Sequence, residues 1–445
     1  MQNKPHKFSF EGRALEYFSL WLVNTILRVV TFGFYYPWAK TNLRKFFYGN
    51  TKLEGSSFSY HGNGMELFKG LLKAITILIL VAGFGLIIAF TASYITNNPV
   101  KRLPYLLTII KIIWALFVTI TPFLLFPFAL HGSIRYLVQR LSWRGIYFNY
   151  HGALQDLIFI YFKYGFLVFI GFAFFVGLSD EGYNQRLTVL TPTLLLFFVA
   201  IFYTTFFVET RGYLFNNITW GNVEVRWYGD GVTFFMLRLR FLFPILLLIF
   251  YLHFQEASAL MIPRLESMGE MYQLLTKIVV GILVFAITMI LTYIWYLHGY
   301  LHYIFSNFRL FQGNDECEVW HESTFKDTLK TCLSVILILW GALTFILIIN
   351  SVFSFMFGIW SGISVGSLEK FSFQNLQIML LLQVLVFVIV MSIAIPFIII
   401  FLMRWVVDGI RIDSKLDLDN LSQKQIGNSE GLGDNLSDIF NIDLV

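Results

Sequence analysis

Charged residues are scarce in this chain. Asp, Glu, Lys and Arg make up 13% of its 445 residues, whereas 57% are hydrophobic and 50 are Phe. A soluble globular domain carries about 25% charged residues, which it needs to cover a surface that faces water. The composition therefore excludes an ordinary soluble globule.

Cysteines and known chemical motifs are also scarce. The two cysteines, Cys317 and Cys332, are predicted in a polar loop and an apolar helix, so we expect free thiols and no cysteine metal cluster. The sequence contains no His-Glu-x-x-His run, phosphate-binding loop, nucleophile elbow or dinucleotide-binding glycine pattern. We therefore predict no catalytic residue, no metal ligand, no cofactor and no nucleic-acid partner.

Long apolar runs, in contrast, are frequent. Runs of about 20 residues or more include "LLKAITILILVAGFGLIIAF" and "IMLLLQVLVFVIVMSIAIPFIIIFLM". A helix of that length crosses a hydrocarbon core of roughly 30 Å and satisfies its own backbone groups. The sequence therefore predicts a mainly α, polytopic membrane protein, a helical bundle of repeated transmembrane helix pairs. The predicted pairs are 67–95 with 104–138, 153–178 with 188–215, 233–254 with 272–305, and 326–356 with 374–408.

A polar, aromatic phrase recurs between these helix pairs. It reads "SFSYHG" from Ser57 and "YFNYHG" from Tyr147, with relatives "KFSFEG" from Lys7, "VRWYGDG" from Val225 and "EVWHES" from Glu318. Alternating aromatic and polar residues are typical of a half-buried strand, and the glycine in "KLEGSSFSY" is typical of a hairpin connection. We interpret the phrase as an internal repeat that places a short β-hairpin between successive helix pairs.

Lys and Arg are distributed unequally between the two predicted faces of the bundle. The face with the hairpins carries about 24 of them and the opposite face about six. Cytoplasmic loops carry an excess of Lys and Arg. We therefore expect a multi-pass protein whose hairpins and C-terminus are cytoplasmic.

The predicted organisation has three parts. Residues 1–50 form a short helical hairpin, for which two alternatives stay open: residues 14–36 cross the membrane once, or the segment dips in and returns. Residues 51–415 hold the repeated helix pairs with their hairpins. Residues 416–445 are predicted to be a disordered acidic tail, because from Asp413 onward seven acidic residues face two lysines, a net charge of −5.

The phrase "YYPWAKTNLRK" does not recur, and it directs the search for function to the N-terminal hairpin. An ionisable side chain deep in apolar sequence is costly and often functional, and cations beside a broken helix can bind anionic headgroups. The alternative is a plain helix start at Pro37 with aromatic residues at the membrane interface. The candidate ligand-binding residues are Arg28, Trp38, Lys40, Arg44, Lys45 and Lys111.

Histidines occupy equivalent positions in three of the predicted hairpins. His61, His151 and His321 each follow an aromatic residue at the end of a strand-like segment. Histidine is a common metal ligand, so the three could converge on one ion. The alternative, which we favour, is that each forms a hydrogen bond within its own turn.

The N-terminal words "FEGRALEYFSLWLVNTILRVVTFGFYYPWAKTNLRKFFYGNTKLEGSSFSYHG" resemble the YjgN family of bacterial inner-membrane proteins, which is defined as a domain of unknown function. The family phrase Tyr-Ser-Pro-Trp-Ala reads Tyr35-Tyr36-Pro37-Trp38-Ala39 here, and the similarity in helix layout extends to about residue 415. The resemblance implies a bacterial inner-membrane location and brings no reaction, substrate or cofactor. The residues that carry it are Phe10, Gly12, Asn24, Leu27, Thr31, Gly33, Tyr36, Pro37, Trp38, Ala39, Arg44, Thr51, Phe58, Tyr60 and Gly62.

These observations favour an inner-membrane protein that transports or binds an amphipathic or anionic small molecule or lipid. Its expected partners are the lipid bilayer, with anionic headgroups among them, and a small-molecule substrate. The alternative is a non-transporting scaffold that recruits cytoplasmic partners through its hairpin layer and acidic tail. Such a scaffold would show hairpins joined into one sheet above a dry, solidly packed helix bundle. A membrane-embedded enzyme is the third hypothesis.

Overall fold

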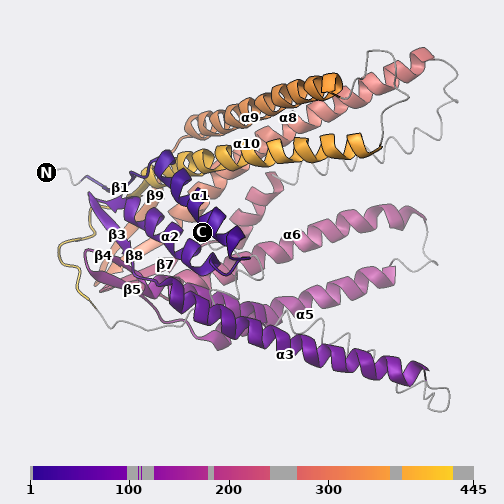
Figure 1. The fold of residues 1–445 in the computed structure, drawn as a ribbon. Coiled ribbons are helices and arrows are strands. Elements are labelled where there is room, and N and C mark those ends of the chain that lie inside the picture. The colour runs from indigo at the N-terminus through magenta and orange to yellow at the C-terminus, as the bar shows by residue number, and fades with distance from the viewer. Residues whose placement is uncertain are drawn as a thin grey trace. The chain divides into compact units, whose positions relative to one another are not determined.

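The structure, a computed structural model, describes residues 4–97, 109, 112, 125–178, 185–240, 268–360 and 373–423. The strands are β1 (His6–Phe10), β2 (Thr51–Leu53), β3 (Ser56–Tyr60), β4 (Leu141–Trp143), β5 (Ile146–Tyr150), β6 (Ile218–Trp220), β7 (Val223–Trp227), β8 (Phe308–Gln312), β9 (Asp315–His321) and β10 (Ile410–Ile412). The helices are α1 (Ala14–Val30), α2 (Tyr36–Asn50), α3 (Gly64–Asn97), α5 (Leu154–Leu178), α6 (Gln185–Asn216), α8 (Met268–Ser306), α9 (Phe325–Trp360) and α10 (Phe373–Asp408) (Figure 1). Residues 125–139 and 231–240 are also helical.

Tight turns join strands that follow each other directly in the sequence. Between β2 and β3, Glu54 and Gly55 have φ values of 47° and 75°, and between β4 and β5, Arg144 and Gly145 have values of 47° and 80°. Two central residues with positive φ give a turn whose twist matches that of antiparallel strands, and glycine adopts this conformation at little cost. Each hairpin is thus specified locally.

Successive hairpins also pair with one another, and the strands of the described residues form one closed barrel. The order around it is β1-β10-β9-β8-β7-β6-β5-β4-β3-β2. Between hairpins, β3 pairs antiparallel with β4, β5 with β6, and β7 with β8. The strands have three to seven residues, fewer than the roughly 9–11 of a membrane-spanning strand. The barrel is therefore too short to cross a membrane.

The predicted fold class is wrong. We expected a polytopic helical bundle of repeated transmembrane helix pairs with separate hairpins between them, whereas the structure has a closed β-barrel. Among the described residues, three helical segments are long and apolar enough to cross a membrane, namely Gly64–Ile87, Phe325–Ile346 and Val384–Asp408. The described residues do not include much of the predicted helix pairs. The parts that lie outside are most of 98–124 and all of 179–184, 241–267 and 361–372.

The error has a physical reason. Alternation of apolar and polar residues indicates a strand, but it does not indicate which strand of another hairpin pairs with it. An open edge presents unpaired N–H and C=O groups, and here they are satisfied by strands from other hairpins. Tyr60, for example, lies opposite Leu141, which is separated from it in sequence by α3 and the helical residues 125–139.

A buried aromatic cluster stabilises the strands of two neighbouring hairpins. The rings of Trp143 and Trp220 meet edge to face with centroids 5.3 Å apart, and Phe148 stacks on Trp220 at 5.4 Å. Such pairs contribute roughly 0.5–1.5 kcal/mol each beyond the burial of their area. Aromatic side chains therefore link β4, β5 and β6 across the boundary between hairpins.

The recurring aromatic phrase has a packing role. After four strands, an aromatic ring lies under the glycine two positions later, so that a Cβ on that glycine would come within 3.0 Å of the ring. Real Cβ atoms essentially never make such contacts, so a larger residue at these four positions would have to displace the ring. The pairs are Phe10 with Gly12, Tyr60 with Gly62, Tyr150 with Gly152, and Trp227 with Gly229.

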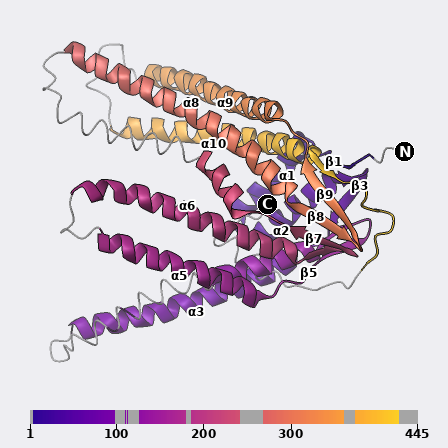
Figure 2. The same cartoon turned by 180° about the vertical axis from the view of Figure 1, so that it is seen from behind.

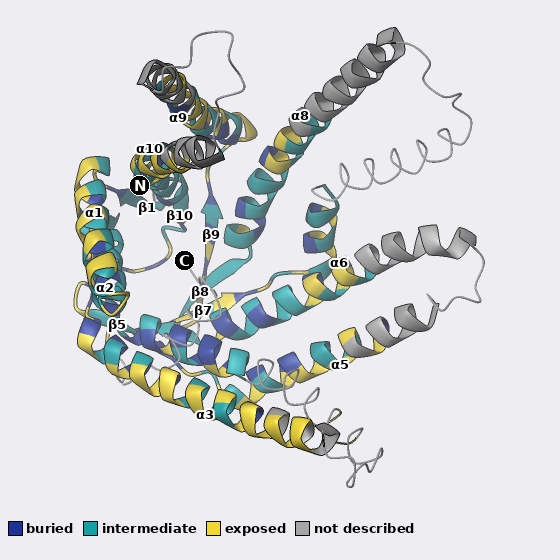
Figure 3. Cartoon of the chain, turned by 45° about the vertical axis from the view of Figure 1, so that its right-hand side comes forward, coloured by how far each residue is buried: buried dark blue, intermediate teal, exposed yellow. Residues whose placement is uncertain are grey.

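The chain divides into two compact units. The first comprises residues 1–6, 58–321 and 411–445, and the second comprises residues 7–57 and 322–410. In the first unit α5 and α6 run side by side (Figures 1 and 2), and α3 exposes apolar side chains along its length (Figure 3). In the second unit α1 packs against α2 and α10. A core of Phe10, Tyr17, Ile400 and Val407 holds this second group together.

Candidate functional site

The N-terminal helices form a tight hairpin that carries most of the predicted site residues. The link between α1 and α2 contains Phe32 and Gly33 with φ values of 51° and 89°, and Gly33 N donates to Arg28 O at 2.7 Å. Pro37 lies in the first turn of α2, where a missing N–H costs nothing. The structure thus has a helix start beside Pro37, directly after the break between α1 and α2, and whether this break lines a headgroup site stays a prediction.

Contacts along the hairpin fix the register of its two helices. Near the base, the ring centroids of Tyr17 and Phe47 are 5.2 Å apart. Halfway along, Asn42 Nδ2 donates to Asn24 Oδ1 at 3.4 Å, and Asn24 is almost completely buried. A polar contact in this position penalises a slip of one helix along the other, because the buried amide would lose its partner.

The same register places Arg28 level with Trp38, near the tip of the hairpin. Arg28 Nη2 donates to Thr25 Oγ1 at 3.0 Å, while its Nε is buried without a hydrogen-bond partner. The Trp38 ring stacks on Tyr35 with centroids 6.1 Å apart. The two residues thus lie near the tip of the same hairpin, on α1 and α2 respectively.

The predicted cations of α2 lie further from the tip. Lys40 and Arg44 are one turn apart on one side of the helix and half-buried, and Lys45 is exposed. Lys111 lies outside the described residues. Five of the six candidate residues thus share one hairpin, and their role in ligand binding stays a prediction.

The tip itself is apolar and exposed, a feature that the sequence analysis missed. Phe32 is 95% exposed, and Val29, Val30 and Phe34 are exposed as well. Exposed apolar patches mark contacts with membranes or other proteins. The words "VVTFGF" contained this signal, since a glycine turn flanked by large apolar residues has no core to bury them.

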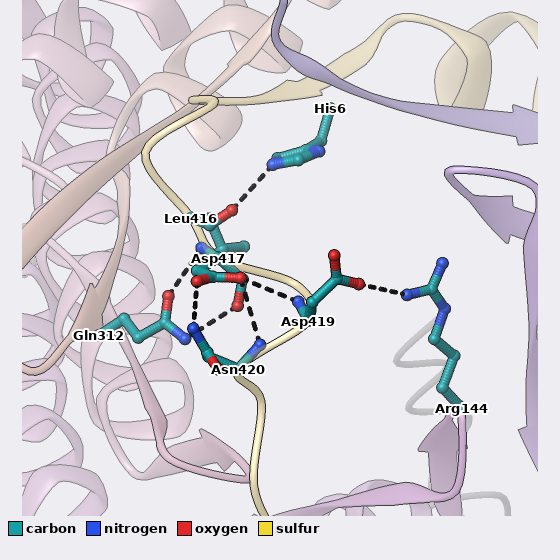
Figure 4. A network of polar contacts seen from close by, with 7 residues as sticks. All are labelled: His6, Arg144, Gln312, Leu416, Asp417, Asp419 and Asn420. Carbon is teal, nitrogen blue, oxygen red and sulfur yellow. Dashed lines mark hydrogen bonds and ion pairs between the residues drawn. The ribbon is translucent and has the colours of Figure 1, made fainter. Parts of the chain in front are cut away.

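A second arrangement is formed by residues 413–423, which we call the strap (Figure 4). It leaves β10 beside β9, where Asp413 N donates to Glu318 O at 2.9 Å, and then contacts β1 and the hairpin turns. The contacts are His6 Nε2 to Leu416 O at 2.9 Å, Gln312 Nε2 to Asp417 O at 2.9 Å, Asp417 N to Gln312 Oε1 at 2.8 Å, Arg144 Nη1 to Asp419 Oδ1 at 3.3 Å, Ser422 N to Asn222 Oδ1 at 3.2 Å and Tyr147 N to Gln423 Oε1 at 2.6 Å.

The strap is held by burial as well as by hydrogen bonds. Leu416 and Leu418 are 1% and 8% exposed and alternate with two aspartates. The Asn420 side chain, followed by the backbone N–H groups of Asp419 and Asn420, donates to the Asp417 carboxylate and lowers the pKa of that group. We predicted a disordered tail from residue 416, but residues 416–423 contact the barrel; residues 424–445 lie outside the described residues.

The hairpin histidines bond to neighbouring strands. His61 Nε2 lies 2.8 Å from Ser142 Oγ, and His151 Nε2 lies 3.2 Å from Thr219 Oγ1. His321 is buried with its ring stacked on Phe305. In the part of the chain that the structure describes, no three His, Cys, Asp or Glu side chains lie close enough to hold a metal ion.

Comparison with known proteins gives a family but no activity. Residues 5–439 match the family described as bacterial protein of unknown function (DUF898). The chain is 24% identical over 226 residues to the inner membrane protein YjgN of Escherichia coli O157:H7 and 22% identical over 226 residues to that of strain K12, covering 50% of this chain and 51% of each relative. It is 36% identical over 77 residues to the inner membrane protein YjgN of Salmonella typhimurium, covering 17% of this chain and 20% of the relative. The chain thus spans about half the length of the first two relatives, and no solved structure matches it.

Proposed function

This chain belongs to the YjgN (DUF898) family of bacterial inner-membrane proteins, and from that premise we propose that its N-terminal hairpin binds an anionic lipid or a related anionic amphiphile. The observation that carries the proposal is the order of side chains along the hairpin. The apolar tip comes first, Arg28 and Trp38 follow, and the cations of α2 lie beyond them.

The dimensions of the hairpin suit one leaflet of a bilayer. Arg44 lies 11 residues beyond Gly33, which corresponds to about 16 Å at a helical rise of 1.5 Å per residue. Half of the hydrocarbon core measures roughly 15 Å. With Phe32 near the middle of the bilayer, Arg44 and Lys45 would therefore lie at the level of the phosphate headgroups.

Both ends of the hairpin gain free energy in this position. Each large apolar side chain moved from water into hydrocarbon contributes about 1.5–3 kcal/mol, and Phe32, Val29 and Val30 are exposed. Each Lys or Arg near an anionic surface contributes about 1 kcal/mol. Binding of a headgroup is the part of the proposal that this geometry supports, and transport stays a prediction.

The test removes the two outer cations, in the variant Arg44→Gln with Lys45→Gln. We expect the affinity for phosphatidylglycerol to fall by roughly tenfold to thirtyfold, since two charges contribute about 2 kcal/mol. Native mass spectrometry of the purified full chain, titrated with phosphatidylglycerol or phosphatidylethanolamine, measures the bound lipid.

The matched control is Lys7→Gln with Arg226→Gln, which removes the same charge from exposed positions on the strands. Its lipid binding should equal that of the wild type. If the control variant lost as much affinity as the hairpin variant, net charge rather than the hairpin would attract the lipid, and the proposal would be wrong.

We further propose that the barrel face and both termini are cytoplasmic, with the hairpin dipping into the membrane and returning. The support is the excess of Lys and Arg on the segments around the strands. A fluorescent reporter fused after Val445 should be active in cells, and a tag before Met1 should be shielded from a reagent that cannot cross the inner membrane. Labelling of the Met1 tag from the periplasm would contradict the dipping hairpin.

The closed barrel favours a second candidate function. For a scaffold that recruits cytoplasmic partners we expected hairpins joined into one sheet above a solidly packed helix bundle, and the strands do form one sheet; the packing of the helix bundle stays a prediction. The strap, however, already contacts the turns beside Arg144, Asn222 and Gln312. A partner at these turns would have to displace the strap, so a scaffold predicts stronger partner capture when the strap is released from the turns but the acidic tail beyond Gln423 is kept.

A further inference from the structure

Two arginines outside the hairpin and the strap share one aromatic cluster. The guanidinium carbon of Arg211, on α6, lies 5.0 Å from the centroid of the Phe207 ring, and that of Arg238, in the helical residues 231–240, lies 6.0 Å from the same centroid. Arg238 also lies 4.1 Å from the Tyr203 centroid and 5.0 Å from the Phe234 centroid. Two positive charges thus lie within 6.0 Å of the centre of one ring, that of Phe207.

The rings form a rigid support for these charges. Phe207 and Phe234 are stacked at 4.6 Å with an interplanar angle of 13°. Tyr300, on α8, packs against both, with centroids 6.5 Å from Phe207 and 6.1 Å from Phe234. Aromatic faces attract a guanidinium group, but they carry no net negative charge. The cluster positions the arginines without neutralising them.

The acidic side chains nearest in sequence are already engaged. Glu209 Oε2 accepts hydrogen bonds from Lys163 Nζ at 2.7 Å and from the Tyr164 hydroxyl at 2.6 Å. Asp230 Oδ2 accepts from the backbone N–H of Thr233 at 2.8 Å and so caps the helix that carries Arg238. Neither carboxylate is available as the main partner of the two arginines.

Within the described residues, Arg211 and Arg238 therefore have no carboxylate partner. Arg238 Nε is in addition buried without a hydrogen-bond partner. A cation near apolar surroundings is costly when it is unpaired. Two such cations around one ring favour binding of an anion, and the described part of the chain supplies no carboxylate for them.

We infer that Arg211 and Arg238 form a binding site for a phosphate group, carried by a phospholipid or present as a free ion. Arg211 lies five residues before the end of α6 and Arg238 seven residues after Gly231, so both are within roughly 10 Å of the strands that follow or precede them. Further along α6, Val199 and Ile201 are exposed. An acyl chain attached to the phosphate would find apolar surface there.

The inference is independent of the proposed hairpin function, because it uses other residues in the other compact unit. A phosphate ligand also explains why both residues are arginine rather than lysine. Arginine offers paired donors that match two phosphate oxygens, which a lysine cannot provide in the same geometry. A change to lysine should therefore keep the charge and lose part of the affinity.

The test uses a double variant, in which Arg211→Gln and Arg238→Gln are combined. The control is Arg240→Gln, which lies on the same helix as Arg238 and whose guanidinium carbon is 4.3 Å from the centroid of the Trp295 ring. Native mass spectrometry of the purified full chain, titrated with phosphatidylglycerol or with inorganic phosphate, measures the bound ligand. We expect about tenfold weaker binding in the double variant, unchanged binding in the control, and an intermediate loss in Arg238→Lys. A ligand-dependent rise in the unfolding temperature gives a second measurement, and it should be largest in the wild type, smaller in Arg238→Lys and smallest in the double variant.

The two ligands separate the sources of the phosphate. Binding of phosphatidylglycerol alone identifies a lipid site, and binding of inorganic phosphate that competes with it identifies a site for the free ion. The inference is overturned if the wild type binds neither, or if the double variant binds as the wild type does. Native mass spectrometry resolves successive lipids bound to one chain, so Arg44→Gln with Lys45→Gln should weaken one binding step and leave the step at Arg211 and Arg238 unchanged, and the present double variant should do the reverse. A failure of the hairpin proposal and a failure of this one therefore give different results.

Discussion

Replacing Gly229 with alanine should lower the free energy of unfolding by about 3 kcal/mol, the upper end of the usual cost of overpacking a buried site. A Cβ on Gly229 would meet the six-membered ring of the Trp227 indole. The indole has little room to move, because it is 3% exposed and its Nε1 donates to Ile304 O at 3.2 Å. Thermal unfolding in detergent, followed by tryptophan fluorescence, measures the change.

Gly231→Ala is the matched control for this substitution, two residues along the same segment. A Cβ on Gly231 would find its nearest neighbour, Thr205 Cγ2, at 4.0 Å, which is ordinary contact. Alanine is also the better helix former, by about 1 kcal/mol, so stability should stay equal or rise slightly. Equal destabilisation at both positions would show that the ring under Gly229 is not the cause.

Opening the strap with Leu416→Asn and Leu418→Asn, which add no charge, should raise the alkylation rate of Cys317 by up to about a hundredfold at pH 8. Cys317 is buried in β9, and burial, followed by the charges of Asp413 and Asp315, raises the pKa of its thiol to about 11. The thiolate is the reactive form. Exposure would move the pKa toward its ordinary value of 9.0. At a pH below both values the thiolate fraction increases tenfold for each pKa unit, and so by up to about a hundredfold.

The wild type and the strap variant should also differ in how the alkylation rate depends on pH. In the wild type the alkylation rate should keep rising up to about pH 11, whereas in the strap variant it should level off near pH 9. A Cys332→Ser background leaves one thiol to follow, and truncation after Gln423 is the control because it keeps every strap contact. Unchanged labelling in a variant that still shows native tryptophan fluorescence would mean that the strap does not cover β9.

Local features of the fold are predictable from the sequence, while its long-range pairing is not. Alternation around Phe58 and glycine at positions 55 and 145 predict strands and turns, and the structure has them there. Nothing in the sequence near Tyr60 predicts that Leu141 lies opposite. Strands pair through backbone N–H and C=O groups, which are nearly the same for every residue type. The strap is an intermediate case: its alternating Leu416 and Leu418 gave a strand-like signal that the acidic composition of the tail obscured.

The candidate site shows the same division. The cations of α2 and the unrepeated phrase around Trp38 direct attention to the hairpin, and the hairpin does bring Arg28 to the level of Trp38. The second pair, Arg211 and Arg238, comes from segments separated by β6 and β7, so no sequence pattern links them. Their association depends on how the rings between them pack, which only the three-dimensional structure reveals.

The neighbouring positions of β1 and β10 in the barrel have a consequence for biosynthesis. The first strand ends at Phe10 and its neighbour begins at Ile410, so 399 residues must be translated between them. At roughly 5–20 residues per second, the ribosome needs on the order of 20–80 seconds for that distance. During this interval the sheet of the nascent chain is not closed. The edge of β1 must be protected from pairing with other chains until β10 has been synthesised.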